Sequence, residues 1–391
     1  MTKIKVYHFH NGKGGGVLSV IKNLLKYSQT PAIENHVIYT INKLNQPNYA
    51  IHNLKGALSE QVFYYSSNWN FYYISKMLAK LLPDEQAIVV AHDWLELGVL
   101  SSLGLRNRVV MFLHGDYDYY YQLARAHDSA INQFITVASN IKNRLKVLLP
   151  NRANDVIYLR FPVPDITFKK EESFKNNIIF IGRLTEDKGY HLLPVIDELL
   201  KNENIFLHWH IVGNKPQNSN CKASWGGDSS VQLYGDLKNE EVFRVLQSMD
   251  FFILPSLAEG MPISLIEAMK AGVIPLVNDI NGGIEELVTD NITGLKIANN
   301  QPWLYARGIR LLIKQKEKFA EISANCSSLA NELFSPIKNT ILIEHQITEL
   351  YRKPVRYKPS KRIYGSLLDQ PWIPNFITRA LRVIKSCYKN A

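Results

Sequence analysis

Residues 255–272 read PSLAEGMPISLIEAMKAG and continue the apolar run Phe251–Pro255. A short apolar run that ends in proline and a polar loop predicts a buried strand. The proline at position 262 favours a helix start, because a residue in the first helical turn needs no acceptor for its N–H. We therefore expect a helix over Pro262–Ala271, ended by a glycine, and a further strand over Val273–Val277.

Strands and helices alternate on both sides of this stretch. Repeated strand, loop and helix units are typical of a parallel sheet covered by helices. Two closely spaced prolines, Pro162 and Pro164, interrupt the pattern and suit an interdomain connection. We predict an α/β fold of two tandem Rossmann-like domains, residues 1–163 and 166–350, followed by a tail, residues 351–391. The other expected strands are Ile4–Phe9, Ala87–Ala91, Val109–Leu113, Asn177–Gly182, Phe206–Val212 and Val231–Tyr234, and the other expected helices are Tyr190–Leu200 and Glu240–Ser248.

The composition is that of a globular protein. Of 391 residues, 46% are hydrophobic and 20% are charged, which excludes an intrinsically disordered chain. The three cysteines, Cys221, Cys326 and Cys387, form no C-x-x-C pair, so neither a disulfide framework nor a structural zinc site is expected. The first residues lack the apolar core of a secretory signal, and no apolar run is long enough to span a bilayer. This predicts a cytoplasmic protein.

The tail carries most of the net charge of +10. Residues 351–391 contain ten lysines and arginines against one acidic residue, Asp369. The segment 375–385 has the apolar spacing of an amphipathic helix with a basic side. Such a helix suits an anionic membrane surface, so we predict a peripheral protein on the inner face of the cytoplasmic membrane. Packing of the tail onto the first domain is compatible with this, and nucleic acid, the other partner of basic tails, is not expected.

Two loops at expected strand ends have features of phosphate sites. Residues 12–16 contain four glycines before a helix, where backbone amides and the helix N-terminus favour an anion. Their spacing fits neither a Walker A loop nor a dinucleotide fingerprint. Arg183 and Lys188 flank a second loop, and together they can neutralise a diphosphate. A tight turn and an ordinary charged surface loop are the plain alternatives.

The helix after Pro262 offers a third anion site. The amides of Ile263, Ser264 and Leu265 lie at the helix start, where no helical acceptor is available. Glu267, further along the helix, is placed to accept hydrogen bonds from ribose hydroxyls. Glu259, in the preceding loop, is placed to contact a sugar hydroxyl. The plain alternative is a pair of solvated glutamates.

Taken together, these motifs resemble the family 4 retaining glycosyltransferases of the GT-B fold. Glu259 and Glu267, in the setting EGMPISLIEAM, look like that family's pair of glutamates. The loop with Arg183 and Lys188 and the segment 281–295 are similar to its neighbouring motifs. The resemblance is strong over residues 177–300 and weak over residues 1–165. It implies two Rossmann-like domains with a cleft between them.

The resemblance also implies a role for each matching residue. It assigns the donor diphosphate to Arg183, Lys188, Gly15, Gly16 and the amides of Ile263, Ser264 and Leu265. Glu267 would bind the ribose, Glu259 would hold the donor sugar, and His114 would lie near the transferred sugar. No metal and no cofactor are expected, because cationic side chains and helix N-termini stabilise the leaving diphosphate.

The implied activity is glycosyl transfer in the synthesis of cell-surface polysaccharide, such as lipopolysaccharide, capsule or exopolysaccharide. A sugar would pass from a UDP- or GDP-sugar to a growing, lipid-linked glycan, with retention of configuration. Three alternatives remain: a metal-dependent transferase that uses Asp116 and Asp118, a non-catalytic nucleotide-sugar-binding protein, and a soluble sucrose- or trehalose-type transferase. A metal cluster of the histidines at strand ends lacks the usual spacing. The tyrosines at positions 117 and 119–121 suit either an acceptor sugar or simple packing.

Overall fold

The computed structural model describes residues 3–13, 15–45, 49, 51–82, 84–166, 174–214, 225, 230–298, 301–355, 360 and 366–390. Gly14, Cys221 and the tail residues Arg356, Lys358, Lys361 and Arg362 lie outside this set. The chain forms two compact units. Unit 1 consists of Met1–Val137, Ile141–Pro162 and Pro336–Ala391, and unit 2 consists of Ala138–Asn140 and Val163–Ser335.

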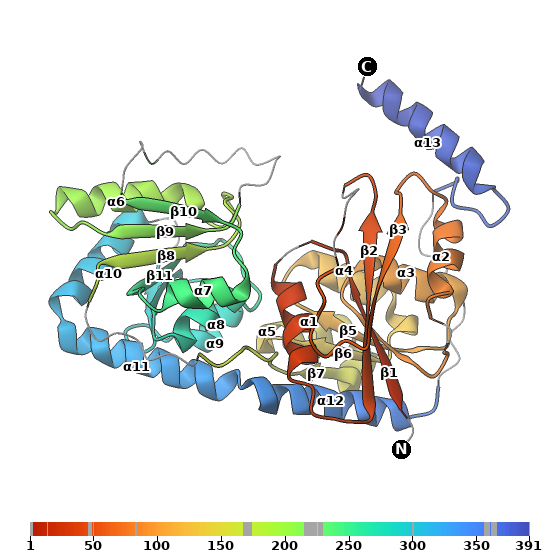
Figure 1. The fold of residues 1–391 in the computed structure, drawn as a ribbon, viewed down its shortest axis with the longest axis horizontal. Helices are drawn as coiled ribbons and strands as arrows, with labels where there is room; N and C mark the ends of the chain where they lie inside the picture. The colour runs from red at the N-terminus through yellow and green to blue at the C-terminus, as the bar shows by residue number, and fades with distance from the viewer. Residues whose placement is uncertain are drawn as a thin grey trace. The chain divides into compact units, whose positions relative to one another are not determined.

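Unit 1 is built on a parallel sheet with helices on both faces (Figure 1). The strand order is β3-β2-β1-β4-β5-β6-β7. Helix α1 lies on one face, and α2 and α3 pack side by side on the other. The strands are β1 Ile4–His10, β2 Ile33–Asn42, β3 Ser59–Tyr65, β4 Ile88–Ala91, β5 Arg108–Leu113, β6 Gln133–Thr136 and β7 Val156–Tyr158. The helices are α1 Gly16–Lys26, α2 Phe71–Ala79, α3 Trp94–Leu103, α4 Asp118–Ala126, α5 Ser139–Leu148, α12 Pro336–Arg352 and α13 Asn375–Asn390.

Unit 2 repeats this design with the strand order β10-β9-β8-β11-β12-β13. Its strands are β8 Asn177–Ile181, β9 His208–Val212, β10 Val231–Gly235, β11 Phe251–Leu254, β12 Ile274–Asn278 and β13 Leu295–Ile297. Its helices are α6 Leu193–Asn202, α7 Asn239–Leu246, α8 Ile263–Lys270, α9 Gly283–Leu287, α10 Pro302–Lys314 and α11 Lys316–Leu333. The central strands β11 and β12 are buried along their whole length, as continuous apolar runs in a doubly covered sheet should be.

The expected elements agree with the observed ones to within a few residues. The expected helix Tyr190–Leu200 begins with a 3₁₀ turn at Tyr190–Leu192 before α6. In unit 1 the sequence analysis located β1, β4 and β5 but not β2, β3, β6 or β7, and in unit 2 it missed β13. The prediction of an α/β fold with two Rossmann-like domains and a helical tail is confirmed.

Helix α12 groups with unit 1, whereas the sequence analysis extended the second domain to residue 350. The buried side of α12 includes Ile343, Ile347 and Leu350, and the helix packs against α1 and β5. Glu344 of α12 is buried and accepts hydrogen bonds from the backbone N–H and the hydroxyl of Thr30, at 3.0 and 2.8 Å. A boundary set by apolar packing and a buried carboxylate is not visible in local sequence.

Candidate active site

The candidate donor site lies at the carboxyl ends of β8 and β11, in the middle of the unit 2 sheet. The chain runs outward from β8 on one side and from β11 on the other, which makes this pair the switch point where open α/β sheets bind ligands. The loops after the two strands pack together. The amide of Leu257 donates to the carbonyl of Asp187 at 2.9 Å. A Cβ on Gly189 would lie 2.2 Å from the carbonyl oxygen of Pro255.

Lys188 and Glu259 form an ion pair between these two loops. Lys188 Nζ lies 2.8 Å from Glu259 Oε1, and the side chains are 13% and 9% exposed. The Coulomb attraction within such a pair is screened less by water than in a surface pair. Loss of either partner leaves the other charge with little solvation. Sequence reasoning gave each residue its own contact with the ligand. The structure adds that they contact each other.

Arg183 stands apart from this pair. Its guanidinium donates to Asp187 at 3.1 Å, and the two side chains are 63% and 55% exposed. Exposed pairs of this kind contribute little and exchange readily. The arginine is therefore able to turn toward an anion at the strand ends without breaking a buried contact.

Helix α8 begins directly after the Glu259 loop. Pro262 is its N-cap residue and no side chain caps the helix start, so the first-turn amides of Ile263, Ser264 and Leu265 keep their capacity to bind an anion. The amide of Gly283 donates to the carbonyl of Gly260 at 2.8 Å. This contact joins the 281–283 segment to the same loop.

Glu267 lies in the middle of α8 and is 4% exposed. Burial raises the pKa of its carboxyl to about 7. Its Oε1 accepts a hydrogen bond from Asn239 Nδ2 at 3.2 Å. Asn239 is the first residue of α7, and sequence reasoning missed it because no motif connects it to Glu267. A buried carboxylate with one amide partner has the capacity to accept further hydrogen bonds from hydroxyl donors.

The candidate site of unit 1 lies at the equivalent switch point, the carboxyl ends of β1 and β4. Asn11 Nδ2 donates to Asp93 Oδ2 at 2.7 Å and joins the loops after these strands. Gly15 has φ +121°, and a Cβ there would meet no atom within 4 Å. The glycine is thus required for backbone conformation and leaves open space in front of α1, which begins at Gly16 without a side-chain cap.

Histidines gather at the carboxyl ends of β1, β4 and the neighbouring β5: His10, His92 and His114. His92 Nδ1 and His114 Nε2 share a hydrogen bond at 2.7 Å. Burial lowers the pKa of His114 to about 3 and that of His10 to about 4, so both rings are neutral at neutral pH. Among the described residues, the buried Nε2 of His92 has no hydrogen-bond partner. Sequence reasoning named His114 but gave His92 no role, because the contact joins different strands.

The first turn of α3 borders this cluster. Asp93 caps α3 and Glu96 Oε1 accepts from the amide of His92 at 2.8 Å. Burial raises the pKa of Glu96 to about 8, so this carboxyl is largely neutral at pH 7. Tyr119 donates a hydrogen bond to Asp93. The cluster therefore presents mostly neutral polar groups.

Asp116 and Asp118 are both ion-paired with Arg144. The guanidinium Nη1 lies 2.9 Å from Asp116 Oδ1, and Nη2 contacts Asp118 Oδ1. Tyr121 also donates to Asp116 at 2.7 Å. A metal bound by this D-x-D pair would have to displace the arginine. Across the part of the chain that the structure describes, no group of three or more His, Cys, Asp or Glu side chains has a metal-binding arrangement.

The comparisons with known proteins converge on the unit that carries the donor motifs. Residues 164–328 match the family glycosyl transferases group 1. This group 1 segment lies wholly within unit 2 and contains Arg183, Lys188, Glu259 and Glu267. The finer assignment to the retaining family 4 stays a prediction.

Relatives and solved structures extend this result. The amylovoran biosynthesis glycosyltransferase AmsK of Erwinia amylovora is 34% identical over 126 residues, 30% of this chain and 31% of AmsK. An alpha-1,3-N-acetylgalactosaminyltransferase of Campylobacter jejuni, named for a diphospho-undecaprenol substrate, is 25% identical over 43% of this chain and 45% of its own length. The alignments thus span less than half of the length of these relatives, 31% of AmsK and 45% of the Campylobacter enzyme. Anabaena HepE, solved with UDP and glucose, covers 88% of this chain and 100% of its own with 17% identity and a TM-score of 0.70, which supports the GT-B fold class.

Within the described residues, no helix combines the length and apolar character needed to cross a bilayer.

Proposed function

We propose that this chain is a glycosyltransferase of cell-surface polysaccharide synthesis. It transfers a sugar from a nucleoside diphosphate sugar to a growing glycan. The Lys188–Glu259 ion pair carries this proposal, because it brings a cation and a carboxylate together at the switch point, beside the uncapped start of α8. The group 1 match over residues 164–328 and the polysaccharide relatives support it.

In the proposed donor complex, the diphosphate binds between Lys188, Arg183 and the first-turn amides of α8. Lys188 then shares its charge between the phosphate and Glu259, whose other oxygen binds a hydroxyl of the donor sugar. Glu267 accepts hydrogen bonds from the ribose. These groups stabilise the negative charge that grows on the leaving diphosphate, which is the main electrostatic task of the reaction.

We further propose retention of configuration without a metal or cofactor. The fixed cations and helix amides supply the positive charge that a metal would otherwise supply. The acceptor hydroxyl then attacks from the face that the diphosphate leaves. His114 and the amides of Gly15 and Gly16 belong to the same proposal as groups near the transferred sugar and the diphosphate. A proton NMR spectrum of the product measures the anomeric configuration directly.

The proposed acceptor is a lipid-linked glycan at the inner face of the cytoplasmic membrane. The Campylobacter relative, named for an undecaprenyl diphosphate substrate, supports this class of acceptor. HepE, solved with UDP and glucose, makes UDP-sugars the first donors to test and GDP-sugars the second.

Thermal unfolding with and without nucleotides tests the proposal. We expect UDP or GDP, in the presence of EDTA, to raise the unfolding temperature, because saturation at 100 times the dissociation constant adds about 2.7 kcal/mol of stability. ADP and CMP serve as controls. A shift that appears only with manganese, and that is lost in D116N/D118N, would favour the metal-dependent alternative instead.

Donor turnover separates an enzyme from a binding protein. The chain is incubated with the stabilising nucleotide sugar and a membrane extract containing lipid-linked glycans, and released nucleoside diphosphate is measured. Release that depends on the extract supports the transferase. Tight binding with neither transfer nor slow donor hydrolysis would support the non-catalytic alternative.

A further inference from the structure

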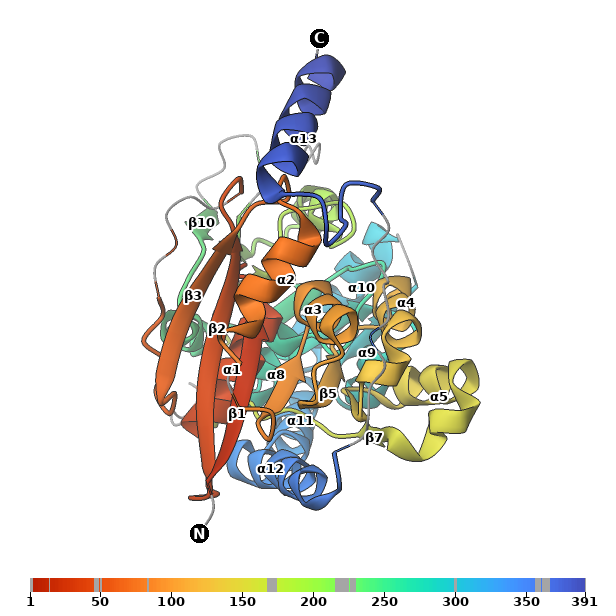
Figure 2. The ribbon, with the colours of Figure 1, turned by 90° about the vertical axis from the view of Figure 1, so that its right-hand side faces the viewer.

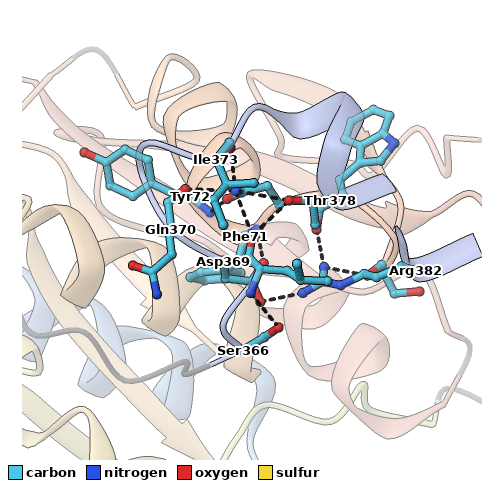
Figure 3. Close-up of polar contacts among 12 residues, drawn as sticks. Phe71, Tyr72, Ser366, Asp369, Gln370, Ile373, Thr378 and Arg382 are labelled. Atoms are coloured by element: carbon cyan, nitrogen blue, oxygen red, sulfur yellow. Dashed lines mark hydrogen bonds and ion pairs between the residues drawn. The ribbon is translucent and has the colours of Figure 1, made fainter. Parts of the chain in front are cut away.

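Helix α13 is attached to unit 1 by its polar side. Arg382 donates to the carbonyl of Trp69 at 2.6 Å and pairs with Asp369 at 2.6 Å. Thr378 is fully buried and donates to the carbonyl of Leu368 at 2.9 Å. Figure 3 shows these contacts gathered around the start of α2. Arg382 and Thr378 of α13 thus fix the helix to unit 1.

The strap before α13 completes this attachment. The amide of Phe71, in the first turn of α2, donates to Asp369 Oδ1 at 2.7 Å. Asn70 is the N-cap of α2. Its backbone N–H donates to Asn375 Oδ1 at 2.8 Å, and its side-chain Nδ2 donates to the carbonyl of Ile373 at 3.0 Å. The first turns of α13 are therefore fixed relative to α2.

The apolar side of α13 faces away from these contacts. Phe376 is 72% exposed, Ile384 is 53% exposed, and Leu381 is 45% exposed. These side chains share one face with Ala380, Val383 and Cys387, because they follow one another at helical spacing. A helix that packs on a globular core buries its apolar face, whereas this helix exposes it. Figures 1 and 2 both show α13 leaving unit 1 beyond its first turns.

The charges on α13 suit an anionic surface. The helix contains no acidic residue, and Asp369, the one carboxylate of residues 351–391, is paired with Arg382 and nearly buried. Arg379 and Lys385 are exposed and border the apolar face on its two sides, where long cationic side chains reach lipid phosphates. Trp372, 72% exposed, lies just before the helix and has the amphipathic ring typical of membrane interfaces.

We propose that α13 lies in the interface of an anionic bilayer, with Phe376, Leu381 and Ile384 among the acyl chains and with its polar side fixed to unit 1. The inference rests on the proposed function for its purpose, since it brings unit 1 to the surface that holds a lipid-linked acceptor. A second copy of the chain is a poorer occupant, because two α13 helices would bring cations of the same sign together. Nucleic acid is also disfavoured, because the exposed face is apolar and Arg382 is already bonded to unit 1.

Vesicle binding by the full chain tests this proposal. Removal of residues 352–391 is unsuitable, because it would also remove the contacts that fix the start of α2. Instead, F376S/I384S is compared with V147S, which replaces an apolar side chain on α5 that is 82% exposed. Vesicles consist of phosphatidylcholine with and without phosphatidylglycerol. We expect the double variant to weaken binding to anionic vesicles about 100-fold, through lost apolar burial, and V147S to bind as the wild type.

Charge and depth are tested separately. R379Q/K385Q should lose about 25-fold in affinity for anionic vesicles, fivefold for each cation, whereas K26Q/K55Q, exposed lysines elsewhere on unit 1, should lose little. Cys387 is exposed and Cys326 is buried, so an environment-sensitive fluorophore attached to Cys387 in a C221S background reports on insertion. A blue shift with anionic vesicles is the expected result.

Several outcomes would overturn the proposal: equal binding by F376S/I384S and V147S, equal binding to neutral and anionic vesicles, no spectral shift at Cys387, or a dimer that F376S/I384S abolishes. Thermal unfolding with UDP and GDP is repeated on F376S/I384S. Because this variant leaves unit 2 unchanged, its nucleotide response tests the proposed function independently of membrane binding.

Discussion

The two candidate sites occupy the same place in their respective sheets but differ in charge. At the ends of β8 and β11, unit 2 presents Arg183 and the Lys188–Glu259 ion pair. At the ends of β4 and the neighbouring β5, unit 1 presents His92 and His114, which burial keeps neutral.

This difference indicates what each site is suited to bind. Fixed cations next to an uncapped helix favour a diphosphate. Neutral imidazoles favour an uncharged ligand rich in hydroxyl groups, because they donate and accept hydrogen bonds without a net charge. The same fold thus carries an anion site in one unit and a neutral polar site in the other, because the residues at the strand ends differ. Four predictions test this contrast.

The largest effect is expected for Lys188→Ala. The variant loses the cation nearest the proposed diphosphate and leaves Glu259 without its partner, so nucleoside diphosphate affinity should fall about 100-fold or more. Calorimetric titration with UDP and GDP measures this loss. Lys318→Ala, which removes an exposed ion pair with Glu321 in the same unit, should bind as the wild type. Equal affinity of the two variants would refute the anion role of Lys188.

His114→Ala should separate the two units functionally. We expect transfer to fall about 10- to 100-fold through the loss of a hydrogen bond to a sugar, while nucleoside diphosphate affinity stays unchanged because unit 2 is intact. Steady-state transfer and nucleotide titration are measured together. His345→Ala, on the exposed side of α12, is the matched control. A parallel loss of nucleotide binding would contradict a division of labour between the sites.

Gly189→Ala should perturb the junction of the two donor loops. A Cβ there would lie 2.2 Å from the carbonyl oxygen of Pro255, in a backbone with φ +70°. Gly235 has a similar φ of +67°, but its nearest neighbour, Asn214 Oδ1, is 3.4 Å away. We expect Gly235→Ala to cost about 1 kcal/mol of unfolding free energy and Gly189→Ala about 2 kcal/mol or more. Denaturant titrations with equal costs would remove the crowding argument.

Glu267→Gln should give the smallest change, seen as a pH dependence. Burial raises the carboxyl pKa from 4.5 to about 7, so between these values the folded state binds more protons than the unfolded state. The stability of the wild type should therefore fall as pH rises through this window and level off above it, relative to the variant, which has no carboxyl to titrate. Unfolding temperatures at pH 5, 6, 7 and 8 should differ by a few degrees between the two proteins.

Nucleotide titrations over the same pH range extend this test. Ribose hydroxyls bind the carboxylate form of Glu267, so the ratio of wild-type to Glu267→Gln affinity should rise with pH up to the carboxyl pKa. The nucleotide phosphate also titrates in this range, but its effect on affinity is the same for both proteins and cancels in the ratio. A ratio that does not change with pH would argue against Glu267 as the ribose ligand.

The sequence by itself determined the fold class and most of the elements that carry the candidate donor site. Runs such as Phe251–Leu254 and the amphipathic spacing of α13 are local signals, because burial and helix periodicity act over a few residues. Pro262 and Gly272 marked the start and the end of α8 for the same reason. The motif residues Arg183, Lys188, Glu259 and Glu267 were likewise found from local spacing.

Only the tertiary structure decided which of these groups meet. Lys188 and Glu259 are 71 residues apart in sequence, and His92 and His114 come from different strands. The pairing of Arg144 with Asp116 and Asp118 joins separate elements as well. The tertiary structure also decided which side of α13 is attached to unit 1. The spacing of its residues defines an apolar face but does not show which face makes the contacts. Such choices depend on contacts between distant segments, which no local pattern encodes.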